Sequence, residues 1–536
     1  MEKYKYHLSI VAILCSILIL FCVNIKDFFL SDDFVFLFYS HFFTIWTNPL
    51  LAIRPFATII FEAQNSIFGF EPQGYHLINI GIHIFNSYLV YFIIKELTNN
   101  ENTSIIGSLM FATFPISSET VIWISAQSDL WMTAFILLSF FSYLKYNKQS
   151  KLIWLILSLI YFSFAILSRE IAIIFILIFF SYDVFFDESF IKYFKESTEP
   201  LIKLKKIGKY CIKYLPFLAI IIILYPLFIF YKKVGLNFTP YFKFASFLDF
   251  FPNSFFPLFL DNSNLYKILF FVSFFSLIVC FIFIFKSQNK VLKLSLIWII
   301  IIIAGFALFN LTSIDIYFYL LILSLNAVPQ GRFLYVIAVG VVIFYSNILA
   351  LLYKKKFNTR FKLPISRKYI FSSFVFFLLI GNSFLIFSQN YNWKRASRIS
   401  YNILIKTFNT VPVGTESVNI YFINVPDHIN NPFGPSWNTF FIFRNGLEEI
   451  AHLFYPNCKI FSFNMIYHKK ILDFELPDWR IPISEIEFDR FSNDSSNVIL
   501  FFNPVTELLI DVSDLNYTDF DPYPFLGIPK FEYWFN

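Results

Sequence analysis

The sequence predicts an all-α polytopic membrane protein with a small α/β domain at its C-terminus. Hydrophobic residues make up 57% of the 536 residues, charged residues only 15%, and the mean hydropathy is +0.64. These values exclude an ordinary soluble domain. Apolar stretches of roughly 20 residues, the length that crosses a bilayer, recur as far as residue 388. Residues 401–536 instead carry a net charge of −9, against +15 for the first 400 residues.

The apolar stretches predict about eleven transmembrane helices. They cover residues 8–25, 75–95, 104–123, 129–146, 152–168, 170–186, 212–231, 266–286, 291–310, 331–352 and 369–388. We interpret the first stretch as a retained helix and not as a cleaved signal, because no small-residue cleavage site precedes Asp32. Residues 1–388 are therefore predicted to form one transmembrane domain.

The basic residues predict how these helices are oriented. Two lysine- and arginine-rich segments, 192–209 and 354–368, fall on the same side of the membrane when the N-terminus is cytoplasmic, as the positive-inside rule requires. The outer side then receives residues 26–74, the turns near 115–128 and 168–170, the segments 232–265 and 311–330, and everything after residue 389.

Residues 389–536 are predicted to form a separate, acidic domain in water on the outer side. Three runs in it have the alternating or apolar pattern of strands, and one has the pattern of a helix. The strands are expected at Ser417–Val425, Thr439–Arg444 and Asn497–Phe502, and the helix at Leu447–Tyr455. This mixture predicts a small α/β fold.

Asp32 and Asp33 stand together directly after the first apolar stretch. Two carboxylates at a membrane surface are costly unless they are paired or used in chemistry. The pair is therefore a candidate catalytic site, and the alternative is a pair of solvated acids at the end of a helix.

The helix expected at 75–95 carries a polar stripe. His76, Asn79, His83 and Asn86 follow one another at steps of three, four and three, which places them on one helical face that must contact protein or water. For His83 and Asn86 the alternative is hydrogen bonding between helices. His76 and His83 lie about 10 Å apart along the helix axis, too far apart to bind one zinc ion, so no metal site is predicted.

Five segments, in order, resemble the signatures of membrane O-mannosyltransferases of the GT-C superfamily, especially the TMTC type and its bacterial relatives. They are Arg54–Phe56, Phe68–Asn79 followed by His83 and Asn86, Phe111–Ser125 followed by Asp129, Leu167–Glu170, and Arg332–Tyr335. The resemblance extends from residue 1 to about residue 395 and does not include the acidic tail.

The resemblance implies a glycosyltransferase that moves a sugar, with mannose the first candidate, from a polyprenyl phosphate to an acceptor hydroxyl on the outer face. Such a reaction needs a carboxylate base and groups that hold the phosphate. Asp32 or Asp33 is expected to be the base, and Asp33 is favoured. The other residues predicted to bind substrate are Arg54, His76, Asn79, Glu119, Asp129, Arg169, Glu170 and Arg332.

The predicted arginines, Glu119 and Asp129 also have structural alternatives. A guanidinium offers paired donors to a phosphate, but Arg54, Arg169 and Arg332 could equally anchor the interface or form ion pairs, such as Arg169 with Glu170. Glu119 and Asp129 could cap helices or tight turns.

Two positions depart from the family pattern. Ser117 stands where these proteins usually have histidine, and Gln127 stands where they have a basic residue. An inactive GT-C-fold partner therefore remains an alternative, as does a transporter or flippase of lipid-linked sugar.

The sequence also predicts partners and a location. No glycine-rich nucleotide loop is visible, which favours a lipid-linked donor. The predicted partners are a polyprenyl-phosphate-linked sugar, an acceptor protein or envelope glycan, and membrane lipid, with no nucleic acid and no cofactor assigned. The expected location is a bacterial cytoplasmic membrane, with the site and the C-terminus outside.

Overall fold

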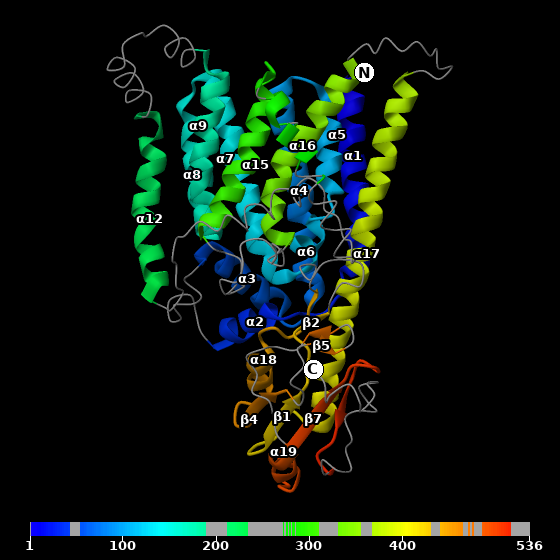
Figure 1. Ribbon diagram of the computed structural model, residues 1–536. Helices are drawn as coiled ribbons and strands as arrows, with labels where there is room; N and C mark the ends of the chain where they lie inside the picture. The colour runs from blue at the N-terminus through cyan, green and yellow to red at the C-terminus, as the bar shows by residue number, and fades with distance from the viewer. Residues whose placement is uncertain are drawn as a thin grey trace.

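The computed structural model is a bundle of long helices with a small mixed domain at one end (Figure 1). It describes residues 2–42, 54–188, 212–233, 272–309 without 273, 274, 277, 280 and 285, 331–354, 367–429, 440–464, 470–471, 474–475 and 485–515. The long helices are α1 (Glu2–Phe21), α4 (Pro72–Thr98), α5 (Glu101–Ala112), α7 (Gln127–Gln149), α8 (Leu152–Ser168), α9 (Phe175–Phe186), α12 (Leu215–Lys233), α15 (Lys290–Phe309), α16 (Gly331–Lys354) and α17 (Arg367–Thr410).

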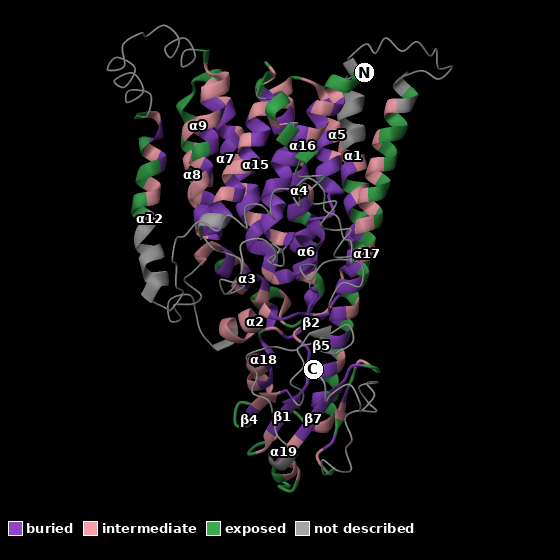
Figure 2. Cartoon of the chain, viewed as in Figure 1, coloured by how far each residue is buried: buried purple, intermediate pink, exposed green. Residues whose placement is uncertain are grey.

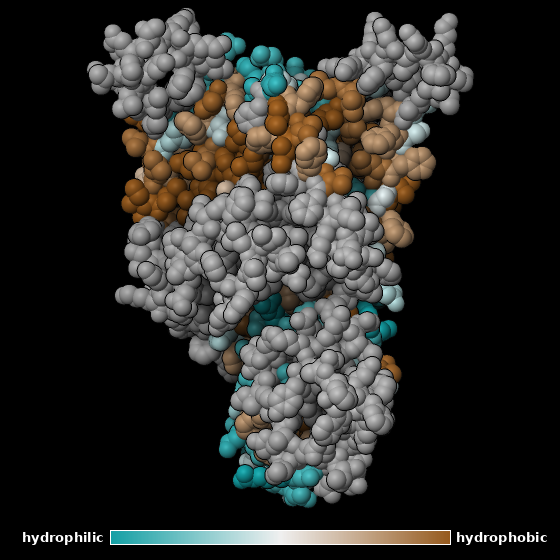
Figure 3. All heavy atoms as spheres, viewed as in Figure 1, coloured by the Kyte–Doolittle hydropathy of each residue, from teal (hydrophilic) through white to brown (hydrophobic). Residues whose placement is uncertain are grey.

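The bundle confirms the predicted helical membrane architecture, and the protein is an integral membrane protein. Among the described residues, four helices are long and apolar enough to cross a membrane: Pro72–Thr98, Ile124–Gln149, Gly331–Tyr353 and Phe371–Thr410. In the space-filling view apolar side chains dominate the visible face of the bundle, and hydrophilic side chains lie at the edges of the terminal domain (Figure 3). The total of eleven spans stays a prediction, because the segments 234–271 and 310–330 lie outside the described residues.

One predicted span is wrong as a single helix. Helix α5 ends at Ala112, and the short helix α6 (Ser117–Ile122) begins only after Pro115. A proline ring clashes with a preceding helical turn and has no N–H to donate. The break at residues 113–116 separates α6, which carries Glu119, from α5.

Two helices fill the segment 26–74, which was predicted only as an outer region. They are α2 (Asp32–Phe42) and α3 (Pro55–Phe68), the second opened by a proline that suits the first helical position. They lie with α6 at the end of the bundle that carries the C-terminal domain, opposite the N-terminus (Figure 1). The described parts of the regions predicted to share one side thus lie at one end of the molecule.

The C-terminal domain confirms the predicted α/β character. A four-stranded sheet has the order β4-β1-β7-β8, in which β4 (Lys459–Phe463), β1 (Asn419–Ile423) and β7 (Asn497–Asn503) are parallel and β8 (Leu508–Asp511) is antiparallel. A second, antiparallel sheet has the order β3-β2-β6-β5. Its strands are Phe440–Phe441, His428–Ile429, Phe474–Glu475 and Lys470–Ile471. The helices are α18 (Leu447–Phe454) and α19 (Glu485–Ser492).

Helix α17 joins the two parts of the molecule. It runs through the predicted domain boundary at residue 388 and continues to Thr410, beside the C-terminal domain (Figure 1). Arg395 and Arg398 of this helix both pair with Glu507, which lies just before β8. The division at residue 388 stays a prediction, and a continuous helix crosses it.

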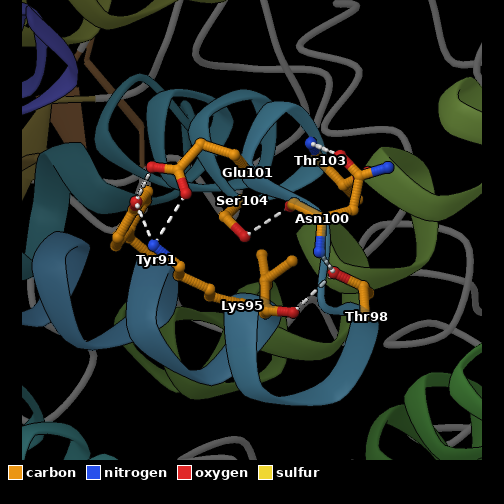
Figure 4. A network of polar contacts seen from close by, with 8 residues as sticks. Tyr91, Lys95, Thr98, Asn100, Glu101, Thr103 and Ser104 are labelled. Atoms are coloured by element: carbon orange, nitrogen blue, oxygen red, sulfur yellow. Dashed lines mark hydrogen bonds and ion pairs between the residues drawn. The ribbon is translucent and has the colours of Figure 1, made fainter. Parts of the chain in front are cut away.

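The helices in the centre of the bundle bury their side chains, whereas the first part of α17 is largely exposed (Figure 2). Helices α4 and α5 are joined by a tight turn at the end opposite the C-terminal domain. There Asn100 caps α5 by accepting a hydrogen bond from the Thr103 amide at 3.2 Å, and Lys95 pairs with Glu101 at 2.7 Å (Figure 4). These contacts hold the two helices antiparallel.

Candidate functional site

Asp32 and Asp33 open helix α2 but lie in different surroundings. Asp33 is 1% exposed and accepts hydrogen bonds from the Leu30 amide at 2.9 Å, the Ser125 amide at 2.7 Å and the Ser125 hydroxyl. Burial raises the pKa of Asp33 to about 7, and the hydrogen bonds from Ser125 and Leu30 oppose this rise. Asp33 therefore ties α2 to the start of α7.

Asp32 is the more accessible of the two carboxylates. It is half-buried, and its Oδ1 accepts a hydrogen bond from the Asn445 side chain at 2.6 Å. It lies close enough to Arg332 for the two charges to interact. The geometry thus favours Asp32 for contact with a substrate, whereas the sequence favoured Asp33.

Three predicted arginines each face a predicted carboxylate. Arg54 donates to Glu170 through Nε at 3.2 Å and Nη2 at 3.0 Å. Arg169, for which an ion pair with the adjacent Glu170 was one alternative, pairs with Asp129. Arg332 lies 4.0 Å from Glu119, beyond hydrogen-bond distance.

The three pairs form one cluster, which we call the arginine cluster: Arg54, Arg169, Arg332, Glu119, Asp129 and Glu170. Arg169 interacts electrostatically with both other arginines. The Phe333 ring lies under two guanidinium groups, that of Arg169 at 4.8 Å and that of Arg332 at 5.2 Å. Arg332 also lies over the Trp123 ring at 4.5 Å, so aromatic faces position the cations.

Glu119 caps a helix, which was the structural alternative predicted for it, and the helix is α16. Its carboxylate accepts hydrogen bonds from the Gly331 and Arg332 amides, which open α16. Gly331 suits this position, because a Cβ there would lie 3.0 Å from Glu119 Oε2. The cap brings Arg332 to the same end of the bundle as Asp32.

The arginine cluster has hydrogen-bonding capacity that the described residues do not use. Three of its buried atoms have no partner among them: Glu119 Oε1, Arg169 Nε and Arg332 Nε. A buried polar atom without a partner is costly, so this arrangement favours a polar ligand.

The polar stripe on α4 faces protein. His76 hydrogen bonds to the Asp27 carbonyl at 2.9 Å, and Asn79 donates to the Val121 carbonyl at 3.3 Å. His83 bonds to the Tyr335 hydroxyl at 2.7 Å, and Asn86 donates to the same hydroxyl at 3.3 Å. The interhelical alternative for His83 and Asn86 is confirmed, and His76 and Asn79 also have backbone partners.

The described residues include no group of three or more histidine, cysteine, aspartate or glutamate side chains placed to hold a metal ion. The sequence missed two contributors to the site, Ser125 and Asn445. Ser125 lies inside one of the recognised segments but gave no sign of its bond to Asp33. Asn445 lies more than 400 positions from Asp32, and nothing in the local sequence links the two.

The fold and the site together define the class: a helical integral membrane protein with a carboxylate and an arginine cluster at one end of its bundle. Residues 49–197 match the family model described as dolichyl-phosphate-mannose-protein mannosyltransferase. Over 93 residues, or 17% of this chain, the sequence is 33% identical to mouse (Mus musculus) protein O-mannosyl-transferase TMTC2. Over 148 residues, or 26% of this chain, it is 28% identical to human (Homo sapiens) TMTC3.

These matches confirm the predicted resemblance to protein O-mannosyltransferases in the first part of the chain. The matched segments span only 11% of TMTC2 and 16% of TMTC3. Among solved structures, ArnT from Cupriavidus metallidurans bound to undecaprenyl phosphate aligns with 94% of this chain and 93% of its own, at 9% identity and a TM-score of 0.44.

Proposed function

We propose that the protein is a glycosyltransferase that moves a sugar from a polyprenyl phosphate to an acceptor hydroxyl. The observation that carries this proposal is the arginine cluster beside Asp32, with its unused buried hydrogen-bonding atoms. Five members of the cluster lie within residues 49–197, the segment that matches the mannosyltransferase family model.

In this reaction the acceptor oxygen attacks the anomeric carbon of the sugar while the bond from that carbon to the phosphate oxygen breaks. The acceptor loses its proton to a carboxylate, and the lipid phosphate leaves with one more negative charge. We assign the base to Asp32, because Asp33 already accepts three hydrogen bonds from the protein. Asp33 then has a supporting role, fixing the position of α2.

The phosphate is assigned to Arg332 and Arg169, with Arg54 further out. Arg332 and Arg169 each have a buried Nε without a partner among the described residues, and guanidinium groups stabilise charge on a leaving phosphate. His76 and Asn79 are assigned to keeping α4 in place beneath the site, since they hydrogen bond to the backbone carbonyls of Asp27 and Val121.

The finer assignments belong to the same proposal. Mannose is the first candidate sugar, because the matched family model and the relatives are named for mannosyl transfer. The site and the C-terminal domain are assigned to the outer face of a bacterial cytoplasmic membrane, following the positive-inside rule. The acceptor is a protein or an envelope glycan.

The test is transfer from a panel of radiolabelled polyprenyl-phosphate sugars to a native membrane extract. Purified wild type is compared with Asp32→Asn, Asp33→Asn and the remote exposed control Asp511→Asn, all at matched folded yield. Loss of a general base costs about 10²–10⁴-fold, so Asp32→Asn should lose at least 100-fold and the control nothing. A folded wild type that transfers no sugar from any donor would overturn the proposal.

A further inference from the structure

The C-terminal domain reaches into the candidate site through one segment. We call residues 440–446 the docking segment; it begins with strand β3 and ends where α18 starts. Its Ile442 carbonyl accepts a hydrogen bond from the Ser31 amide at 2.8 Å, and the Asn445 amide donates to the Ser31 hydroxyl at 3.3 Å. The residue before Asp32 is thus bound directly to the C-terminal domain.

Aromatic packing fixes the docking segment on the membrane part of the chain. Phe443 stacks on Phe34 of α2, with ring centres 5.3 Å apart and an angle of 14° between the planes. Phe441 packs on Trp123 at 5.0 Å, and Trp123 in turn carries Arg332 on its ring. All four aromatic and apolar partners are buried: Phe34, Trp123, Phe441 and Phe443.

Gly446 sets how closely the docking segment approaches α2. Its φ of +90° is one that residues with a Cβ rarely adopt. A Cβ at this position would lie 2.5 Å from the Ser31 carbonyl oxygen and 2.7 Å from Phe34 Cβ. No side chain fits there without moving the backbone.

Before Gly446 the segment has two polar residues next to the site, Arg444 and Asn445. The Asn445 side chain donates to Asp32 Oδ1 at 2.6 Å, whereas Oδ2 accepts no hydrogen bond from the residues that the structure describes. Arg444, held over the Phe441 ring at 5.3 Å, lies close enough to Arg332 for the two charges to interact. The docking segment thus adds a fourth guanidinium next to the arginine cluster.

We propose that Asn445, a residue of the C-terminal domain, is a positioning residue for Asp32. Its side-chain amide holds the Asp32 carboxylate so that Oδ2 faces the acceptor. This inference rests on the proposed function only in that an acceptor faces Asp32, because the contact between Asn445 and Asp32 involves protein groups alone. A hydrogen bond to a carboxylate fixes its rotamer and keeps one oxygen in a set direction, which a reacting group requires. The C-terminal domain is then part of the site and not an appendage.

The first experiment needs no sugar donor. The full-length protein in detergent is treated with a water-soluble carbodiimide and an amine, and mass spectrometry measures amide formation at Asp32 and Asp33. The variants are Asn445→Ala, Asn445→Gln and the control Asn457→Ala, whose amide donates to Glu416 at 3.3 Å on the same domain, away from the site.

In Asn445→Ala we expect the rate of amide formation at Asp32 to rise about threefold or more. This factor corresponds to the lower end of the net free energy of one hydrogen bond. Asp33 should stay protected, Asn445→Gln should restore part of the protection, and Asn457→Ala should resemble wild type. The proposal is overturned if Asp32 reacts equally in Asn445→Ala and wild type, or if Asp32 and Asp33 rise together, since the amide would then not act on Asp32 specifically.

The second experiment uses transfer kinetics. Asn445→Ala should lower kcat about tenfold with KM for the polyprenyl-phosphate sugar changed less than about twofold, because positioning of a base acts on the transition state. Asn445→Gln should recover part of kcat. An unchanged kcat in an active Asn445→Ala enzyme would overturn the positioning role. If wild type transfers no sugar but the labelling result holds, the proposed function fails and the Asn445 contact stands.

Discussion

Both ends of the helix bundle carry clusters of charged side chains, but the clusters are built differently. At the end away from the C-terminal domain the ion pairs of the described residues use lysines: Lys95 pairs with Glu101, Lys145 and Lys148 with Glu96, and Lys213 with Asp183. At the other end all three cations of the cluster are arginines.

The two clusters also differ in how completely they are satisfied. Asp183 Oδ2 alone accepts hydrogen bonds from Tyr143, Tyr214 and Lys213, and Glu96 binds two lysines. The arginine cluster instead leaves Glu119 Oε1, Arg169 Nε and Arg332 Nε without partners among the described residues. We call the pairs at the first end the lysine cluster: Lys95, Lys145, Lys148, Lys213, Glu96, Glu101 and Asp183. Its contacts are typical of a structural role, whereas the arginine cluster has the features of a site that binds a ligand.

The largest expected effect is the loss of the buried pair between Arg169 and Asp129. Both side chains are almost fully buried, at 3% and 2% exposure, so Arg169→Gln leaves a buried carboxylate unpaired. Breaking such a pair costs about 3–5 kcal/mol. We expect that loss in the free energy of unfolding, measured by denaturant titration in detergent micelles. The double variant Arg169→Gln, Asp129→Asn should recover much of it, and failure to do so would show that the arginine stabilises through other contacts.

Arg332 is expected to affect transfer more than folding. Its guanidinium lies 4.0 Å from Glu119, and it shares the Phe333 ring with Arg169 in addition to its contact with the Trp123 ring. Removing one donor to developing charge costs about 10²–10³-fold in rate, so Arg332→Gln should lose transfer by that factor. The measurement is kcat/KM with the polyprenyl-phosphate sugar that wild type uses. A variant that loses stability but keeps its kcat/KM would place Arg332 with the structural cations.

The pH dependence of stability should identify the buried acids near the site. The raised pKa of Asp33, about 7, means that the folded protein binds this proton more tightly than the unfolded chain. The contribution of Asp33 to the free energy of unfolding is fully present below about pH 4 and is lost as the pH rises through 7. Between pH 5 and 7 this contribution falls by about 2 kcal/mol.

Asp27 acts in the same direction, because burial also raises its pKa to about 7. The two acids together make the free energy of unfolding fall as pH rises from 5 to 7. Asp33→Asn should therefore remove about half of this pH dependence, and Asp27→Asn the other half. The check is the free energy of unfolding at pH 5, 6 and 7 for wild type and both variants. A slope unchanged in Asp33→Asn would mean that water or the described hydrogen bonds keep this carboxylate ionised.

The interface with the C-terminal domain offers a closely matched pair of glycines. Gly446 and Gly414 have almost the same φ, +90° and +88°, but only Gly446 is packed against other atoms. Alanine at either position bears the same backbone strain, of about 1 kcal/mol. Gly446→Ala should in addition undock the segment and expose Asp32 to carbodiimide. Equal behaviour of the two variants would show that close packing at Gly446 does not hold the segment.

The sequence predicted the bundle well because hydrophobic length and periodicity are local signals. The strands near residues 419–423 and 497–503 and the helix at 447–454 were also predicted within a few residues. The break at Pro115 was missed, because the apolar stretch 104–123 was interpreted as one span. Helices α2 and α3 were missed because the surrounding segment was interpreted only by its position between spans.

The site was less accessible to sequence reasoning. The structure brings the six charged residues of the arginine cluster together, but the pairing of Arg169 with Asp129 and of Arg54 with Glu170 depends on how four helical segments pack. The choice between Asp32 and Asp33 is likewise set by residues far along the chain. Ser125 buries one carboxylate, and Asn445 contacts the other.

The smallest expected effect lies in the lysine cluster and tests whether that end of the bundle is only structural. Lys148 is half exposed and shares Glu96 with Lys145, so Lys148→Gln leaves the carboxylate paired. Exposed ion pairs contribute about 0–1 kcal/mol. We expect a change of that size in the free energy of unfolding and none in kcat/KM. A large loss of transfer in a stable Lys148→Gln variant would break the contrast between the two ends, because it would give the lysine end a part in turnover.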